Sequence, residues 1–333
     1  MSTEFLKITE SKATTAHPNA TRRTKFTNSH LEVRMFNVGD GEAILIAFPN
    51  RRAWLIDGGT GVGTAHNHTL GQQLAAHLQQ RNLTLEALVP SHPHKDHVGA
   101  VAPLLRAVPP LADPLTIYRS ADGTWDADTA WLADLRQALP AQVNTVALSD
   151  AHREVTVSDG VEAHFFAGSG DGAYTSIFLQ LRFHQARLLF TGDAHCAYER
   201  DLLQRFGDDD FRADVLKVTH HGSSSGTAQR VVNAVKPAIA IASTQSDGGH
   251  RLEADTLQRL RNNGPQRRIF ETLIDGDIIL RTDGEAFGGG VLYQVELVAP
   301  GLFEAALGAV TLPRATVDAQ RTVSANHPDC VQA

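Results

Sequence analysis

Residues 91–97 read Ser-His-Pro-His-Lys-Asp-His and place four potential metal ligands within six consecutive positions. Alternate residues of an extended chain point to the same side, so His92 and His94 can share one metal ion. Asp96 and His97 lie past a bend, where a helical pattern begins, and are directed to a neighbouring position. A polar loop of solvated histidines is the alternative, but this loop follows an apolar strand pattern, and α/β proteins place their sites at such strand ends. The stretch therefore predicts a metal centre.

Three further apolar runs end in potential ligands. The first ends at Asp193, directly after a glycine. The carboxylate of an aspartate at this position can bridge two ions, and the alternative is an ordinary turn residue. The second ends in the pair His220 and His221, and the third leads into a loop that contains His250. Imidazole and carboxylate ligands without thiolate suit zinc, manganese or iron. Such a set usually holds two ions about 3.5–4 Å apart, so we expect two divalent metal ions, with zinc as the first choice.

The order of strand and helix patterns indicates the architecture. A meander of short strands is followed by alternating helices and strands, and the same succession then occurs a second time. Strands are expected at 31–38, 42–48, 53–57, 85–90, 115–118, 155–158, 161–166, 175–183, 186–190, 214–218, 238–242, 268–273 and 277–281. Helices are expected at 69–80, 98–108, 126–139, 197–206, 227–235 and 254–261. Each sheet can bury one face on the other and cover its outer face with helices. We therefore predict an α/β fold, a four-layer αββα sandwich of two mixed β-sheets flanked by helices.

Composition divides the 333 residues into a tail, one domain and an extension. Residues 1–30 carry scattered Lys and Arg among many Thr, Ser and Asn, and we expect a flexible N-terminal tail there. Residues 31–284 form the domain, which is long enough to bury a core. Residues 285–333 are expected to form a C-terminal extension, with one possible strand over 292–298 followed by a partly ordered tail.

Cysteine usage and charge restrict the environment and the partners. Cys196 and Cys330 lie far apart and in no Cys-x-x-Cys motif, so we expect neither a disulfide framework nor a thiolate zinc site. This usage, with no secretory signal, favours a reducing cytoplasm. No run approaches the roughly 18 apolar residues of a membrane span, so we expect no membrane partner. The formal net charge of −7 argues against a protein that coats nucleic acid, although a local basic patch can serve a substrate phosphate.

Several motifs, in this order along the chain, resemble those of the metallo-β-lactamase-fold hydrolases. They are Phe-Asn-Val-Gly-Asp-Gly-Glu-Ala at 36–43, Leu-Ile-Asp-Gly-Gly at 55–59, the histidine cluster, Thr-Gly-Asp at 191–193, Leu-Lys-Val-Thr-His-His-Gly-Ser at 216–223 and Gly-His at 249–250. More narrowly, the chain resembles the hydrolase domain of ComEC-type DNA-uptake channels and its free-standing relatives, which include phosphorylcholine esterase. The resemblance covers residues 31–284 and implies the same αββα fold.

The resemblance also implies two sets of metal ligands. The first set is His92, His94 and Asp193; the second is Asp96, His97, the shared Asp193 and one of His220 and His221. We favour His220 as the ligand and His221 as a partner of substrate or proton. Asp57 is expected to orient the ligand loop through hydrogen bonds, with a plain turn residue as the alternative.

One position departs from the wider fold. Many members have another histidine ligand shortly before the strand that leads to the bridging aspartate, and residues 167–176 contain none. ComEC-type members also tend to lack it. The first metal is therefore short of a ligand, and Asp171, His164 or water can take the place. Partial occupancy of this position is one consequence.

Hydrolysis by a metal-bound hydroxide is the chemistry that this set of ligands predicts. No serine elbow or nucleophilic cysteine motif is present, so no covalent intermediate is expected. Asp96, His221 and His250 are the catalytic candidates, with a histidine protonating the leaving group. The first hypothesis is a phosphodiesterase or nuclease that acts on a small phosphodiester or on nucleic acid. The alternatives are a lactonase or β-lactamase-like ester or amide hydrolase, and a metal-binding module without turnover.

The remaining histidines and a basic segment receive simpler interpretations. His77, His152 and His184 are expected to face solvent. Five arginines lie between residues 251 and 268, next to His250, and predict either a solvated helix face or a patch that steers phosphate.

Overall fold

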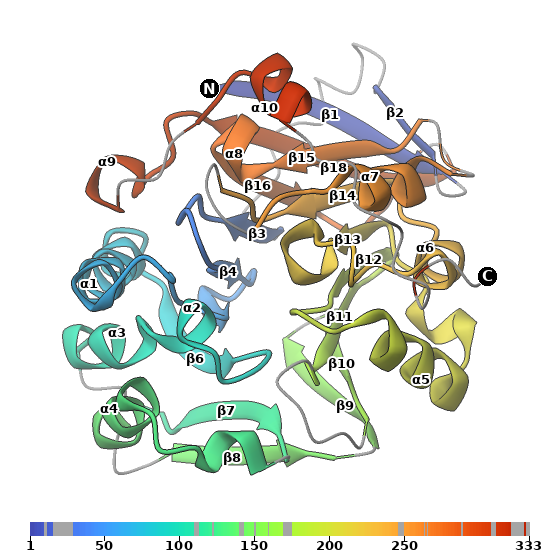
Figure 1. Cartoon of the computed structure of the whole chain (residues 1–333). Coiled ribbons are helices and arrows are strands. Elements are labelled where there is room, and N and C mark those ends of the chain that lie inside the picture. Colours follow the sequence, from blue (N-terminus) through green and yellow to red (C-terminus); the bar gives the residue numbers. More distant parts are fainter. Residues whose placement is uncertain are drawn as a thin grey trace.

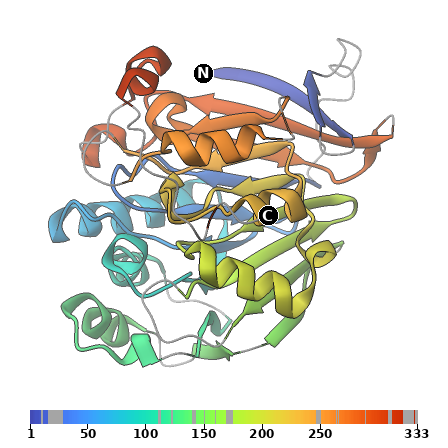
Figure 2. The ribbon, with the colours of Figure 1, turned by 45° about the vertical axis from the view of Figure 1, so that its right-hand side comes forward.

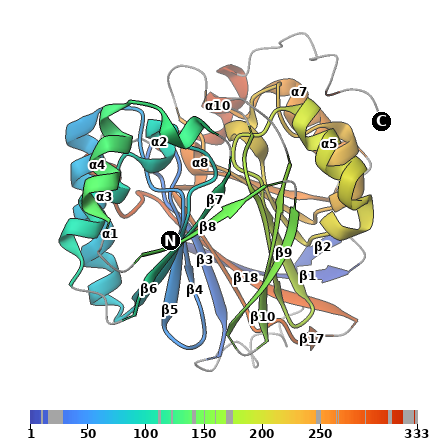
Figure 3. The same cartoon turned by 90° about the horizontal axis from the view of Figure 1, so that it is seen from below.

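Two sheets pack face to face, and helices cover both outer faces (Figures 1 and 3). The computed structural model describes residues 1–9, 12–15, 29–109, 113–121, 123–139, 143–149, 151–158, 160–168, 175–245, 250–262, 264, 266–287, 289–307, 311–320 and 330. Seen end-on in Figure 3, one helical layer lies outside each sheet, with the strands between them. The predicted four-layer αββα sandwich is confirmed.

The first sheet carries the strands that lead to the histidine cluster. In spatial order it contains β2 (Lys12–Thr15), β1 (Ser2–Thr9), β18 (Gly290–Val298), β16 (Asp277–Thr282), β3 (Leu31–Met35), β4 (Ile44–Ala47), β5 (Arg52–Ile56), β6 (Thr84–Val89), β7 (Leu115–Ser120) and β8 (Val143–Leu148), with β17 (Ala286–Phe287) paired to β18. Its outer face is covered by α1 (Thr64–Gln80), α3 (Val101–Ala107) and α4 (Ala130–Ala138). Strands β5 to β8 are parallel, so the loops that follow them leave from one edge.

The second sheet carries the strands that lead to Asp193 and to the histidine pair. Its order is β15 (Arg268–Glu271), β14 (Ile239–Ala242), β13 (Val215–Lys217), β12 (Ala186–Phe190), β11 (Phe178–Phe183), β10 (Val161–Ala167) and β9 (Ala151–Ser158). Its outer face packs on α5 (Cys196–Phe206), α6 (Gln229–Val235) and α7 (Ala254–Arg261). Apolar residues of both sheets form the central core between them. Strands β12 to β15 are parallel, and their ends place the remaining ligands at one edge.

The N-terminal residues are part of the sheet. β1, at the N-terminal end in Figure 2, pairs antiparallel with β18. Its alternate residues Leu6 and Ile8 are buried in the core. The prediction of a flexible tail is therefore wrong over β1 and β2, because these apolar residues cover the face of the sheet next to β18. Residues 10–11 and 16–28 lie outside the described part of the chain.

The C-terminal extension also belongs to the fold. The strand predicted over 292–298 is present within β18, which lies between β1 and β16. Two short helices follow, α9 (Glu304–Leu307) and α10 (Arg314–Gln320). Phe303 stacks on Phe36 with ring centroids 4.8 Å apart, so the chain after β18 packs against the first helical layer.

The two cysteines form a disulfide. Cys196 is the first residue of α5, and its Cα lies 5.2 Å from that of Cys330. Both are buried in the core beneath the second helical layer. The sequence interpretation, which expected no disulfide framework, missed this bond, because a contact across 134 residues leaves no local sequence pattern. No helix among the residues described is long and apolar enough to cross a bilayer.

Candidate metal centre

The histidine loop is held by two glycine-containing loops that pack against its backbone. The amide of Glu42 donates to the carbonyl of Asp96 at 3.0 Å, and the amide of Gly59 donates to the carbonyl of Glu42 at 3.0 Å. A Cβ atom at Gly59 would overlap the backbone at Lys95 to His97, so only glycine permits this approach. The motifs at 36–43 and 55–59 thus shape the start of α2 (Lys95–Val98), where Asp96 and His97 lie.

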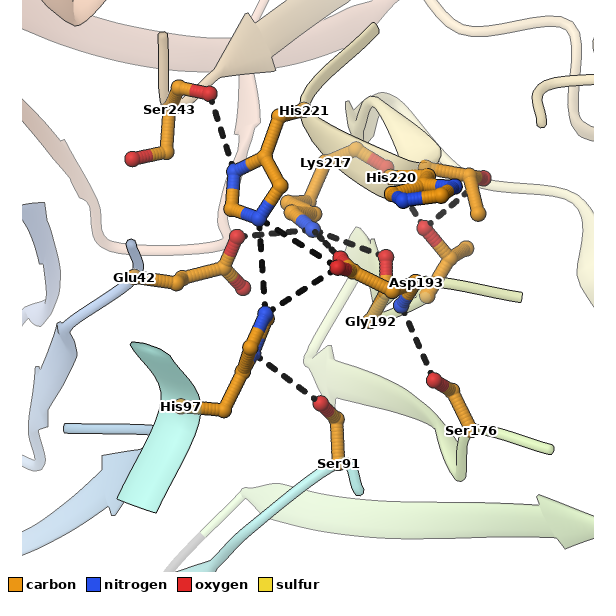
Figure 4. A network of polar contacts seen from close by, with 12 residues as sticks. Glu42, Ser91, His97, Ser176, Gly192, Asp193, Lys217, His220, His221 and Ser243 are labelled. Atoms are coloured by element: carbon orange, nitrogen blue, oxygen red, sulfur yellow. Dashed lines mark hydrogen bonds and ion pairs between the residues drawn. The ribbon is translucent and has the colours of Figure 1, made fainter. Parts of the chain in front are cut away.

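Four ligand atoms from three separate loops converge next to this helix, and Figure 4 shows the side chains of His97, Asp193 and His221 among them. They are Oδ2 of Asp96, Nε2 of His97, Oδ2 of Asp193 and Nε2 of His221. The Nε2 of His97 lies 3.4 Å from Asp96, 3.1 Å from Asp193 and 3.3 Å from His221. The Nε2 of His221 lies 3.3 Å from Asp193 and 4.0 Å from Asp96. Ligands bound at about 2.0–2.1 Å around tetrahedral zinc are about 3.3 Å apart. The spacing of the four atoms therefore fits one divalent ion.

His221, rather than the expected His220, belongs to this group. Both residues follow β13 in left-handed conformation, with φ of 50° and 53°, which turns the two side chains in different directions. The Nδ1 of His221 faces the carbonyl of Ser243 at 3.1 Å, so its Nε2 points to the cluster. His220 instead has its Nδ1 3.1 Å from the hydroxyl of Ser225, and its ring stacks on His195. The geometry therefore favours His221 over His220 as the ligand.

His92 and His94 lie beside the four-atom group without completing a second one. Their rings are 4.4 Å apart, and the Nε2 of buried His92 has no hydrogen-bond partner among the described residues. Within that part of the chain, neither histidine joins a set of three ligand atoms within 4.8 Å of one another. Asp171, the predicted substitute ligand, lies outside the described residues. The orphaned nitrogen of His92 is nevertheless what an additional ion would bind.

His164, the other suggested substitute, lies elsewhere. Its ring nitrogens face Glu154 and Glu162 on the second sheet. The suggestion that it completes the first metal site is therefore wrong, because the antiparallel pairing of β10 with β9 directs its side chain to those neighbours.

Asp57 holds His97 and the start of the ligand loop. One carboxylate oxygen accepts a hydrogen bond from the amide of Ser91 at 2.7 Å, and the other lies 3.0 Å from Nδ1 of His97. Burial opposes protonation of His97, but the carboxylates of Asp193, Asp57 and Asp96 raise its pKa well above the ordinary value. These are the contacts expected of a residue that orients a metal ligand.

Lys217 and Glu42 form a buried ion pair behind Asp193 that was not foreseen from the sequence. The ammonium of Lys217 lies 2.7 Å from Glu42 and 3.5 Å from Oδ1 of Asp193, and it donates to the carbonyl of Gly192 at 2.8 Å (Figure 4). Burial opposes ionisation of Asp193, but His221, His97 and Lys217 lower its pKa well below the ordinary value. A lysine within an otherwise apolar strand was the available signal for this pair.

Comparison with known proteins agrees with this geometry. Residues 37–246 match the family described as the metallo-beta-lactamase superfamily. The chain belongs to this superfamily. It is 28% identical over 220 residues to Recombination protein 2 of Haemophilus influenzae, covering 64% of this chain and 24% of that protein. It is 24% identical over 275 residues to ComE operon protein 3 of Bacillus subtilis, and this match covers 77% of this chain and 32% of that protein. The ComEC-type resemblance is confirmed, although the chain spans only a quarter to a third of these relatives.

A solved structure also aligns with most of the chain. The metallo-beta-lactamase fold protein YhfI from Bacillus subtilis aligns with 75% of this chain and 99% of its own length, at 15% identity and a TM-score of 0.49.

Within this member of the superfamily, three partly exposed histidines besides His94 extend from the four-atom group through ring contacts with His221 and with one another. They are His195, His220 and His250. His250 stacks on His221 with ring centroids 4.3 Å apart, and its Nδ1 pairs with Asp40. Burial lowers the pKa of His220 to about 4, whereas the Asp40 carboxylate overcomes burial and raises the pKa of His250. His195 and Asp40 were missed in the sequence, although Asp40 lies in a recognised motif.

Two of the arginines next to His250 are occupied by structural contacts. Buried Arg259 donates to the carbonyls of Thr227, Ser224 and Gly226, and Arg268 pairs with Glu4 of β1. Buried Arg259 therefore belongs neither to a solvated helix face nor to a patch that steers phosphate, whereas Arg268, on β15, keeps a partly exposed side chain.

Proposed function

We propose that the protein is a metal-dependent phosphodiesterase that acts on a small phosphodiester or on nucleic acid. The observation that carries the proposal is the convergence of Asp96, His97, Asp193 and His221. Next to them lies a rim formed by the imidazole side chains of His195, His220 and His250. The superfamily is generally hydrolytic and binds divalent metal ions.

The four converging residues would hold one divalent ion, zinc in our proposal, which supplies a Lewis acid and lowers the pKa of water. A further ion on His92 and His94 stays a prediction, because it needs a ligand beyond those described. The chain's own groups keep the ligands in place. Asp57 positions His97, the Ser243 carbonyl positions His221, and Lys217 neutralises the rear oxygen of Asp193.

The rim supports an anionic substrate with a leaving group that needs a proton. Imidazole N–H groups of His195 and His220 are suited to donate to the charged oxygens of a phosphodiester. Asp40 binds Nδ1 of His250, so Nε2 is left to donate to the leaving oxygen. One relative is named for recombination, a process of nucleic acids, whose backbone linkage is a phosphodiester.

The test is an assay of the full chain after dialysis against zinc, manganese or ferrous iron. The substrates are bis-p-nitrophenyl phosphate, p-nitrophenyl phosphorylcholine, single- and double-stranded DNA, an acyl lactone and a chromogenic cephalosporin. We expect turnover of at least one phosphodiester that chelation abolishes. Turnover confined to the lactone or the cephalosporin, or bound metal with no turnover of any substrate, would overturn the proposal.

A further inference from the structure

A second group of potential metal ligands lies on β9 and β10, at the edge of the second sheet (Figure 1). Three atoms converge there: Nε2 of His152, Oε1 of Glu154 and Nδ1 of His164. The two histidine nitrogens are 3.2 Å apart, and Glu154 lies 3.3 Å from His164 and 3.7 Å from His152. Tetrahedral zinc with bonds of about 2.0–2.1 Å spaces its ligands about 3.3 Å apart, so the triangle has the size of one face of such a site.

Strand pairing fixes this arrangement. Glu154 lies directly opposite His164 in the antiparallel pair, and His152 lies two residues from Glu154 on the same face. The ring of His152 stacks on Phe166 with centroids 4.6 Å apart and an interplanar angle of 2°. The prediction that His152 simply faces solvent is therefore incomplete, because one face of its ring is covered. Two adjacent strands thus present all three donors on one face of the sheet.

The surroundings of His164 resemble those of a metal-bound imidazole. Its side chain is 2% exposed, and its second nitrogen lies 3.4 Å from the carboxylate of Glu162. Histidines that bind a metal usually donate their other N–H to a carboxylate, which fixes the tautomer and the ring. Arg182 places an opposing positive charge nearby, but two carboxylates, Glu154 and Glu162, outnumber it.

We propose that His152, Glu154 and His164 form a second metal site for a zinc-like divalent cation, independent of the proposed function. The side chain of Glu154 is 64% exposed and that of His152 is 29% exposed, so an ion can enter from solvent. Three protein ligands leave the fourth position of a tetrahedral ion to water or to a donor from another molecule. The site joins the edge strand β9 to β10 and stabilises that edge when the ion binds.

The experiment counts zinc in the full chain. Wild type and His152→Ala are stripped with chelator, dialysed against zinc chloride and analysed by mass spectrometry for metal per chain. Wild type is expected to bind one zinc more than His152→Ala, while hydrolysis of bis-p-nitrophenyl phosphate is the same for both. Glu162→Gln is expected to retain the site with about 10–100-fold weaker zinc affinity.

The matched control is His184→Ala, since His184, in the turn between β11 and β12, also lies near a glutamate, 3.8 Å from Glu285, but belongs to no set of three converging ligand atoms among the described residues. It is expected to bind as much zinc as wild type. Equal zinc in wild type and His152→Ala, or an equal loss in His184→Ala, would overturn the proposal. Circular dichroism of each variant shows whether the fold is kept, and Glu154→Gln, altered at an exposed side chain, repeats the count if His152→Ala unfolds.

Discussion

The Nε2 atoms of His97 and His221 lie 3.3 Å apart, although 124 residues separate them in the chain. Each ring is fixed from behind, His97 by Asp57 at 3.0 Å and His221 by the carbonyl of Ser243 at 3.1 Å. Two imidazole nitrogens aimed at each other beside two carboxylates need a cation or a proton between them. The pair therefore connects the two sheets through the candidate metal centre.

Replacing His221 by Ala is expected to remove the metal ion, because one of four ligands is lost. His220→Ala, the matched control, is expected to keep the ion and to lose only part of the activity, since its ring lies on the rim. Metal content per chain distinguishes the two variants. Retention of metal by His221→Ala together with its loss from His220→Ala would restore the assignment made from the sequence.

The buried pair of Lys217 and Glu42 predicts a large loss of stability in Lys217→Met. The substitution leaves two buried carboxylates, Glu42 and Asp193, without their cation, and breaking such a pair costs about 3–5 kcal/mol. The free energy of unfolding is measured in urea with a chelator present. The double variant Glu42→Gln and Lys217→Met is expected to recover part of the loss; a single variant as stable as wild type would contradict the role given to the pair.

His77 was expected to face solvent, but it is buried on α1 with its ring edge-on to Phe36. Burial, with Arg34 and Arg81, lowers its pKa from 6.5 to about 4. The unfolded chain then binds this proton more readily, so stability is complete above pH 6.5 and falls as the pH drops toward 4.

Wild type is expected to lose on the order of 3 kcal/mol more than His77→Gln between neutral pH and pH about 4. The measurement is urea unfolding of both proteins across this range, with a chelator present. Equal acid dependence of the two would show that His77 does not titrate as its burial implies.

The disulfide closes a loop of 134 residues and ties the end of the chain to α5. Reduction is expected to destabilise the protein by roughly 2–5 kcal/mol. Thiol titration in denaturant counts free cysteines, and thermal unfolding is followed with and without reductant. Cys330→Ala is the control, because reductant should not change its unfolding temperature; two free thiols in the untreated wild type would contradict the pairing.

Local patterns in the sequence carried much of the fold and of the site. His92, His94, Asp96 and His97 lie between the end of one strand and the start of one helix, so their arrangement depends only on local structure. The apolar periodicity of that strand and helix was recognisable in the sequence. Asp193 was recognisable for the same reason, as a single acid at the end of an apolar strand. The two-sheet architecture followed from the repeated order of elements.

What the sequence did not reveal depends on contacts between distant residues or on single backbone angles. The pairing of β1 with β18 and the disulfide join opposite ends of the chain. The choice between His220 and His221 depends on two successive left-handed residues, which no composition rule requires of histidine. Lys217 stands out as a lysine in an otherwise apolar strand, but its partner Glu42 lies far away in the sequence and is brought beside it only by the fold.

The most direct test of the central claim is a joint measurement of metal content and phosphodiester hydrolysis for Asp193→Asn. The carboxylate of Asp193 contacts both His97 and His221. The Asp193→Asn variant is therefore expected to lose the bound ion, and its activity on bis-p-nitrophenyl phosphate is expected to fall at least roughly 100-fold. Loss of the metal with full activity, or retention of both, would contradict the account of this site.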